Sequence, residues 1–199
     1  MSAIIDKPVR QQQVFNVPNQ LTVLRLLLSM VLFALIEFEY YLSSTVVFAL
    51  AAGTDWLDGY WARKYGQVTN LGRILDPFVD KIIICGTFIF LVAVPHSGVL
   101  AWMAVVIVGR ELLVTALRSY LEGEGADFSA SMSGKLKMAV QCLAAIICLY
   151  ALYHDSAHTD RPRPDELDWA VKVGVWSAVA LTLYSGAAYV HRAILLFKR

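Results

Sequence analysis

The sequence predicts an all-α membrane protein whose six helices cross the bilayer. Of its 199 residues, 58% are hydrophobic and only 17% are charged, which is far more apolar than a soluble domain of this size. The apolar residues form runs close to the ~20 residues that cross a bilayer as a helix, and short polar turns separate these runs. We therefore expect one membrane domain over residues 19–199, preceded by a polar membrane-surface segment over residues 1–18.

Turn signals bound the six expected spans in chain order. The first covers 19–36, where Asn19 or Thr22 could cap its start, and the acidic, aromatic EFEYY separates it from a second span over 41–63. The third covers 72–94 and ends at the turn PHSG, and the fourth covers 99–121. The glycine-rich loop EGEGADFSASMSG leads to a fifth span over 136–153. A polar loop over 154–168 then precedes the sixth span, over 169–196.

Basic residues favour one side of this arrangement. Six spans place both termini on the same side, and most lysines and arginines fall there: Lys7, Arg10, Arg63, Lys64, Arg73, Arg118, Lys135, Lys137, Arg192, Lys198 and Arg199. The opposite side has Arg161, Arg163 and Lys172, mixed with acidic residues. Because cytoplasmic loops carry the excess of Lys and Arg, we expect both termini in the cytosol.

Four aspartates at the connection between the second and third spans are the main candidates for a site. Asp55 and Asp58 precede it, and Asp76 and Asp80 follow it. Spacings of three and four residues place each pair on one helix face. Small residues share these faces and leave room for a ligand: Gly59, Ala62 and Gly72. In a helical hairpin, each aspartate of one helix would face an aspartate of the other at matching depth, on the cytosolic side.

Such a group of carboxylates calls for cations. Four facing carboxylates cannot all stay ionised on their own, and hard oxygen ligands suit Mg²⁺ or Mn²⁺. Carboxylates within a membrane are costly and functional by default. The alternative is that they pair with basic neighbours such as Arg63, Arg73 or Lys81. A pair of carboxylate-bound metals serves phosphoryl chemistry, and Asp80, the deepest in its helix, could act as a general base.

The spacing of these residues resembles that of a known family. Asp55-x-x-Asp58-Gly59-x-x-Ala62-Arg63, eight further residues, and Gly72-x-x-x-Asp76-x-x-x-Asp80 match the signature of the CDP-alcohol phosphotransferases. The resemblance implies that all four aspartates bind two divalent ions and that Asp80 is also the base. It further implies CDP contacts from Gly59, Arg63 and Thr69, with Asn19 and Thr22 nearby. Arg63 could instead be a topology anchor and Thr69 a helix cap.

Other stretches are similar to the phosphatidylglycerophosphate synthases within that family. These are NVPNQLTVLR at 16–25, GRELLVTALR at 109–118 and GKLKM at 134–138. The resemblance implies transfer of a phosphatidyl group from CDP-diacylglycerol to sn-glycerol 3-phosphate, in a homodimer in the inner membrane of a bacterial cell. The acceptor phosphate needs cations, and the candidates are Arg110, Arg118, Lys135 and Lys137. Arg110 lies in an apolar helix and needs a partner. We expect its neighbour Glu111 not to face it and an aspartate of the hairpin to be the alternative partner.

Several rival functions stay open on the residues alone. Phosphatidylglycerol as the acceptor would make the chain a cardiolipin synthase, and serine or inositol phosphate are further acceptors. An aspartate-rich membrane prenyltransferase would need more spans and another aspartate pattern. A divalent-cation transporter would place acidic residues near the midplane in a repeated architecture, and no repeat is visible. His154 and His158 have metal-ligand spacing, but we favour a solvated loop there.

Overall fold

The computed structural model describes residues 17–65, 70–123 and 132–197. Within these ranges, some residues, among them 55–65, 70–77 and Asp80, are described by their backbone alone. The described chain forms six α-helices and no strand: α1 (Val17–Glu37), α2 (Tyr41–Tyr65), α3 (Asn70–Ala93), α4 (Ala101–Gly123), α5 (Met132–Ala157) and α6 (Asp165–Phe197). The predicted all-α class is confirmed.

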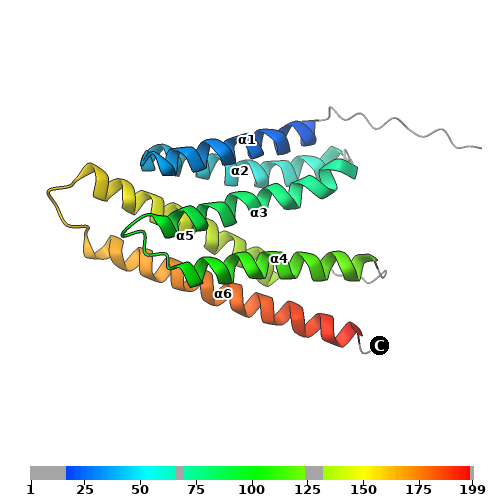
Figure 1. The fold of residues 1–199 in the computed structure, drawn as a ribbon. Helices are drawn as coiled ribbons and strands as arrows, with labels where there is room; N and C mark the ends of the chain where they lie inside the picture. The colour runs from blue at the N-terminus through cyan, green and yellow to red at the C-terminus, as the bar shows by residue number, and fades with distance from the viewer. Residues whose placement is uncertain (1–16, 66–69, 124–131, 198–199) are drawn as a thin grey trace, which may run out of the picture.

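The helices run alternately up and down along one common direction (Figure 1). α1 packs against α2 and α3, while α4 packs against α3 and α6. α5 contacts three helices, α2, α3 and α6, and so joins the two halves of the bundle. The starts of α1, α3 and α5 and the ends of α2, α4 and α6 lie at one end (Figure 1). The α1–α2, α3–α4 and α5–α6 turns lie at the other.

Several helices are longer than the hydrophobic pattern predicted. α1 already begins at Val17, so the predicted caps Asn19 and Thr22 lie inside it, and that prediction is wrong. α5 continues to Ala157, and α6 begins at Asp165 with three acidic residues in its first turn. Acidic side chains there complement the positive end of the helix dipole. The hydrophobic pattern predicts only the apolar part of a helix, so it missed these end turns, which are polar.

The turn between α1 and α2 ends the first helix without a glycine. The amide of Tyr40 donates to the carbonyl of Leu35 at 2.9 Å, and the amide of Glu39 donates to that of Ile36 at 3.1 Å. This is the hydrogen-bond pattern of a Schellman C-cap, whose C′ residue adopts the left-handed conformation. Glu39 occupies that position with φ 62°, and two helices are thereby reversed within three residues.

The predicted turn at residues 95–98 is confirmed between α3 and α4. His96 and Gly98 have positive φ, at 61° and 77°, and the Ser97 hydroxyl accepts a hydrogen bond from the Val99 amide at 3.2 Å. A Cβ on residue 98 would lie 2.5 Å from Cγ1 of Val171 in α6. Gly98 is therefore required both by the turn and by the close approach of α6.

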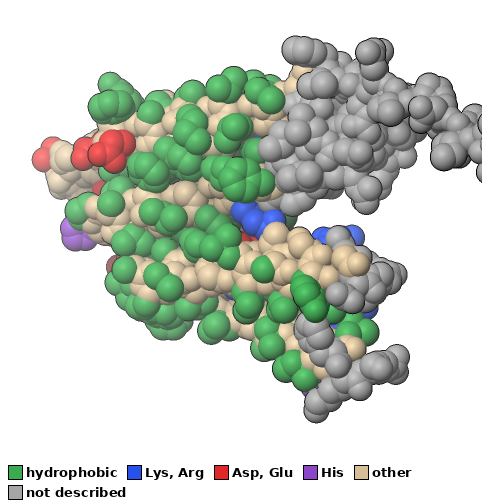
Figure 2. All heavy atoms as spheres, turned by 45° about the vertical axis from the view of Figure 1, so that its right-hand side comes forward, with side chains coloured by type: hydrophobic (Ala, Val, Ile, Leu, Met, Phe, Trp, Pro, Cys, Tyr) green, Lys and Arg blue, Asp and Glu red, His purple; other side chains and the backbone are tan. Residues whose placement is uncertain are grey.

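One apolar core runs through all six helices. Its fully buried large side chains include Leu32, Phe48, Phe88, Met103, Leu149 and Val171. Large hydrophobic side chains also cover the outside, as Figure 2 shows, with Leu27, Val105, Leu143 and Tyr184 among them. Within the described chain, the stretches Gly134–Ala157 and Asp165–Leu196 are long and apolar enough to cross a membrane.

Candidate functional site

The four aspartates occupy matching positions on two helices joined by a four-residue connection. Asp55 lies ten residues before the end of α2, and Asp80 lies ten residues after the start of α3. At the helical rise this places both about 15 Å from the connection. Asp58 and Asp76 are seven and six residues from the same helix ends. The helix bounds thus keep the matching distances predicted from the sequence spacing, and the facing of the aspartates stays a prediction because their four side chains lie outside what the structure describes.

For most of the residues expected to contact CDP, the structure gives the position along a helix. Gly59 and Arg63 belong to the last turns of α2, and Asn19 belongs to the first turns of α1, which packs against α2. Thr22, on α1, is 3% exposed. Thr69 lies outside the described residues. The predicted CDP contacts themselves stay predictions.

A buried charged cluster joins side chains of α4 and α5, two helices that both pack against α3 and α6. Nη1 of Arg110 lies 3.3 Å from Oε1 of Glu111, and Nζ of Lys137 donates to the same oxygen. The side chains of Arg110, Glu111 and Lys137 are only 10%, 11% and 5% exposed. We expected Glu111 not to face Arg110, and this was wrong. The Arg110 side chain is long enough to curve back to the next residue, although the two Cβ atoms diverge.

Arg110 is held in place by α6 as well. Its Cγ would lie 3.1 Å from a Cβ added to Gly186, and the centre of its guanidinium lies 5.4 Å from the centroid of the Tyr189 ring. Nε and Nη2 of Arg110 are buried and have no hydrogen-bond partner within the described chain. Because buried polar groups are normally paired, we expect either a ligand or an aspartate of α2 or α3, whose side chains are not described, to complete these two donors.

The four predicted acceptor cations separate into two groups. Arg110 and Lys137 come together through Glu111, whereas Arg118 and Lys135 are exposed near the adjoining ends of α4 and α5. Figure 2 shows Lys and Arg side chains in the bundle beside residues that the structure does not describe. Arg110 and Lys137 are the buried pair of cations, while Arg118 and Lys135 lie nearer the ends of their helices.

Glu111 is the member of the cluster that sequence reasoning did not assign. A carboxylate beside Arg110 in an apolar helix is itself costly, and this cost was the signal that could have found it. Its second partner, Lys137, is 26 residues away on another helix. No helical spacing rule reaches that far, so only the arrangement of α4 and α5 around their shared neighbours α3 and α6 reveals the pair.

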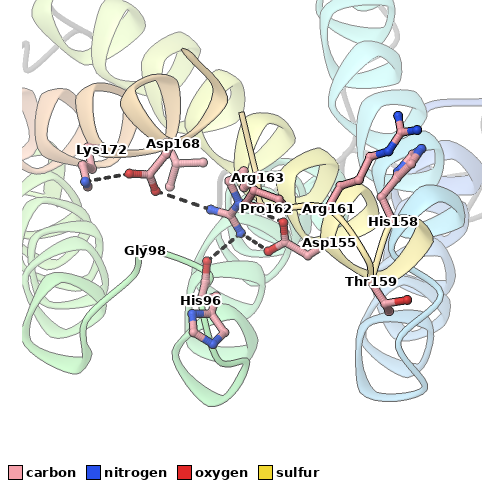
Figure 3. A pocket seen from close by; sticks show the side chains of 11 residues that line it. His96, Gly98, Asp155, His158, Thr159, Arg161, Pro162, Arg163, Asp168 and Lys172 are labelled. Carbon is pink, nitrogen blue, oxygen red and sulfur yellow. Dashed lines mark hydrogen bonds and ion pairs between the residues drawn. The ribbon is translucent and has the colours of Figure 1, made fainter. Parts of the chain in front are cut away.

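A polar cavity of about 500 Å³ lies at the end of the bundle with the α3–α4 and α5–α6 turns. Arg163 is at its centre and donates to the Asp155 carboxylate and to the carbonyl oxygen of His96, while His158 and Arg161 point away (Figure 3). His154 lies on α5 rather than in a loop, and it stacks on His158 with ring centroids 4.7 Å apart. Among the described residues no group of three or more His, Cys, Asp or Glu side chains could hold a metal ion.

Comparison with known proteins shows which family this chain resembles. A sequence model of the CDP-alcohol phosphatidyltransferase family matches residues 15–184. A Bacillus subtilis (strain 168) protein named CDP-diacylglycerol–glycerol-3-phosphate 3-phosphatidyltransferase is 34% identical over 88% of this chain and 93% of its own. Proteins of the same name from Pseudomonas fluorescens and Haemophilus influenzae are 39% and 36% identical over 67% and 65% of this chain and 72% and 73% of their own. With a match that runs through α1 to α5 and into α6, the chain belongs to the CDP-alcohol phosphatidyltransferase family.

Proposed function

We propose that this protein transfers the phosphatidyl group of CDP-diacylglycerol to sn-glycerol 3-phosphate, giving phosphatidylglycerophosphate and CMP. The observation that carries this proposal is the similarity to relatives of that name, which for the Bacillus subtilis protein extends over 88% of the chain. The buried cations of α4 and α5 support it independently, because a phosphorylated acceptor needs such a site.

We also propose that all six helices cross the membrane, with both termini and the aspartates on the cytosolic side. The described helices have 21 to 33 residues, enough for the hydrocarbon core of a bilayer. In support, the start of α1 and the ends of α2, α4 and α6, near which most of the basic residues lie in the sequence, are at the same end of the bundle (Figure 1). The domain would cover 19–199 in a bacterial inner membrane, and the resemblance to the family is the support for a homodimer.

Divalent ions would be held by Asp55, Asp58, Asp76 and Asp80. The donor set fits, since it consists of hard carboxylates at matching positions on two connected helices, and membership of the family supports a divalent-metal requirement. When bound, two Mg²⁺ or Mn²⁺ ions would neutralise the diphosphate and stabilise the charge that develops on its oxygens.

The residues of the chain then have distinct roles in the transfer. Asp80 accepts the proton of the 1-hydroxyl of glycerol 3-phosphate. That oxygen bonds to the phosphorus that carries diacylglycerol, the bond from this phosphorus to the bridging oxygen breaks, and CMP leaves with the electron pair. Arg63 pairs with the CMP phosphate, and Gly59 permits close approach. Thr69, Asn19 and Thr22 line the nucleotide.

The acceptor phosphate would lie against Arg110 and Lys137, with Arg118 and Lys135 nearer the cytosol. Arg110 supplies two parallel donors, which fits a phosphate. The ammonium of Lys137 adds a third cationic contact. Glycerol 3-phosphate could thus enter from the cytosol while the acyl chains of the donor stay in the bilayer.

The proposal is tested with purified protein, CDP-diacylglycerol, Mg²⁺ and one acceptor at a time. We expect CMP release with glycerol 3-phosphate, and its loss on chelation with EDTA. Dependence on phosphatidylglycerol instead would make the protein a cardiolipin synthase, and dependence on serine or inositol phosphate would make it another member of the family. CMP release with none of them would reject the proposal. An Asp58→Asn variant must be inactive, which rules out a contaminating enzyme.

A further inference from the structure

Glu111 is a buried carboxylate at a junction of three helices, with no role yet in the reaction. It lies on α4, receives Lys137 from α5, and pairs with Arg110, whose side chain rests on α6. A single oxygen, Oε1, takes both contacts. The position of each cation therefore depends on this one carboxylate.

The contact with Glu111 uses only one nitrogen of the Arg110 guanidinium. Nη1 donates to Glu111, whereas Nε and Nη2 have no partner among the side chains that the structure describes. Nε and Nη2 share one edge of the guanidinium plane, and that edge donates two parallel hydrogen bonds to an oxyanion. The Tyr189 ring and the backbone at Gly186 limit how the guanidinium can move.

We infer that Glu111 is a positioning residue for the acceptor: it holds Arg110 by Nη1 so that the Nε–Nη2 edge stays free for the acceptor phosphate, and it fixes Lys137 beside that edge. The inference rests on the proposed function for the identity of the acceptor. It assigns Glu111 no contact with substrate and no proton transfer.

Electrostatics explains why a carboxylate is needed at this position. Arg110 and Lys137 would repel each other without it, and two uncompensated buried cations are costly. Both side chains are flexible, so each would turn toward another partner. With Glu111 present, the cluster keeps one net positive charge and an open pair of donors. Such a site favours a phosphate monoester over an acceptor without a phosphate, such as serine.

The kinetic test replaces Glu111 by glutamine, which keeps the shape and removes the charge. For Glu111→Gln we expect the KM for glycerol 3-phosphate to rise about tenfold or more, with little change in kcat or in the KM for CDP-diacylglycerol. Glu111→Asp, which keeps the charge on a shorter stem, should recover part of the loss. Thr115→Val is the matched control, because Thr115 lies one turn further along α4 and bonds only the Glu111 carbonyl. An unchanged or lower KM in Glu111→Gln would overturn the inference.

A double mutant separates positioning from a general loss of packing. Glu111 acts partly through Lys137, so its role is partly lost once Lys137 is replaced by methionine. Glu111→Gln should therefore raise the KM for glycerol 3-phosphate by a smaller factor in the Lys137→Met background than in the wild-type background. Fully additive effects would contradict the inference. The double variant also removes both partners of the buried pair, so it should fold even where Glu111→Gln does not.

A binding measurement distinguishes failure of this inference from failure of the proposed function. Inorganic phosphate, at constant ionic strength set with chloride, should raise the Tm of the wild-type protein and should do so far less in Glu111→Gln. If this holds but glycerol 3-phosphate supports no CMP release, the proposed function fails and the role of Glu111 stands. If phosphate gives no stabilisation of the wild type, or an equal one in both proteins, the role of Glu111 is rejected.

Discussion

Carboxylates inside the apolar helices of this protein have two different roles in our proposals. Glu111 is neutralised within the chain by Arg110 and Lys137, whereas the four aspartates of α2 and α3 are proposed to bind divalent ions. A carboxylate that its own chain neutralises can position other groups. One that relies on a bound cation can take part in the chemistry of the site.

Asp80→Asn tests the residue assigned to proton transfer. Asparagine keeps the size of the side chain but cannot accept the proton, so we expect CMP release to fall by about a hundredfold or more. Stabilisation of the protein by CDP-diacylglycerol should largely remain, because three aspartates are still present. CMP release in the presence of glycerol 3-phosphate, and the Tm with and without donor, measure the two effects.

The control for this variant is Asp160→Asn, an exposed aspartate in the α5–α6 turn. It should retain the activity of the wild type. If Asp80→Asn turns over substrate as fast as the control, Asp80 is not the base. That result would not test the roles of the other three aspartates.

At the scale of the elements, Arg163 connects the turns at the end of the bundle away from the aspartates. Its side chain is 11% exposed. Nη2 donates to the His96 carbonyl oxygen at 2.9 Å, Nε donates to Asp155 at 3.1 Å, and Nη1 lies 3.9 Å from Asp168 (Figure 3). The α3–α4 turn, the end of α5 and the start of α6 are therefore joined by one side chain.

Arg163→Leu should accordingly destabilise the helix bundle without altering its chemistry. Loss of charge-assisted hydrogen bonds and an uncompensated Asp155 should cost about 2 kcal/mol, seen as a lower Tm of the detergent-solubilised protein. Arg161→Leu is the matched control, since Arg161 is exposed in the same turn. An equal Tm for the two variants would show that the Arg163 contacts do not hold this end together.

The elements also show how far sequence reasoning reaches. Six helices and the turn at Gly98 were predictable, because apolar runs and turn residues are local signals. The ends of α1, α5 and α6 were not, since polar helical turns such as the one with Asp165 look like loop. For the site, the pairing of the aspartates across the hairpin stays a prediction from their spacing. The Glu111–Lys137 pair could not be predicted, because it depends on how α4 and α5 are arranged around α3 and α6.

At the scale of the whole molecule, the two ends of the bundle differ in charge and in chemistry. The end of the bundle at which α2, α4 and α6 end has the aspartate positions and the exposed Arg118 and Lys135. The other end has the Arg163 cavity, in which Arg163 and Lys172 pair with Asp155 and Asp168. We therefore expect a soluble phosphorylated acceptor to approach from the first end.

The orientation of the molecule in the membrane can be tested with two matched cysteine variants. Ser119→Cys lies near the end of α4 on the side of the termini, and Ser156→Cys lies in the last turn of α5 on the other side; both serines are exposed. Because positive charge stays in the cytosol, a membrane-impermeant maleimide should label Ser156→Cys in intact bacterial cells and Ser119→Cys only after permeabilisation.

The protein without an added cysteine is the control, since it already has three free thiols, Cys85, Cys142 and Cys148, and labelling is read as the increase above it. The opposite pattern would place the aspartates outside the cell, away from cytosolic glycerol 3-phosphate. Labelling of both variants in intact cells would mean that the bundle does not span the membrane in one orientation. If intact cells show labelling of Ser156→Cys but not of Ser119→Cys, the result agrees with an acceptor that enters from the cytosol and a lipid donor that enters from the bilayer. No other pattern does.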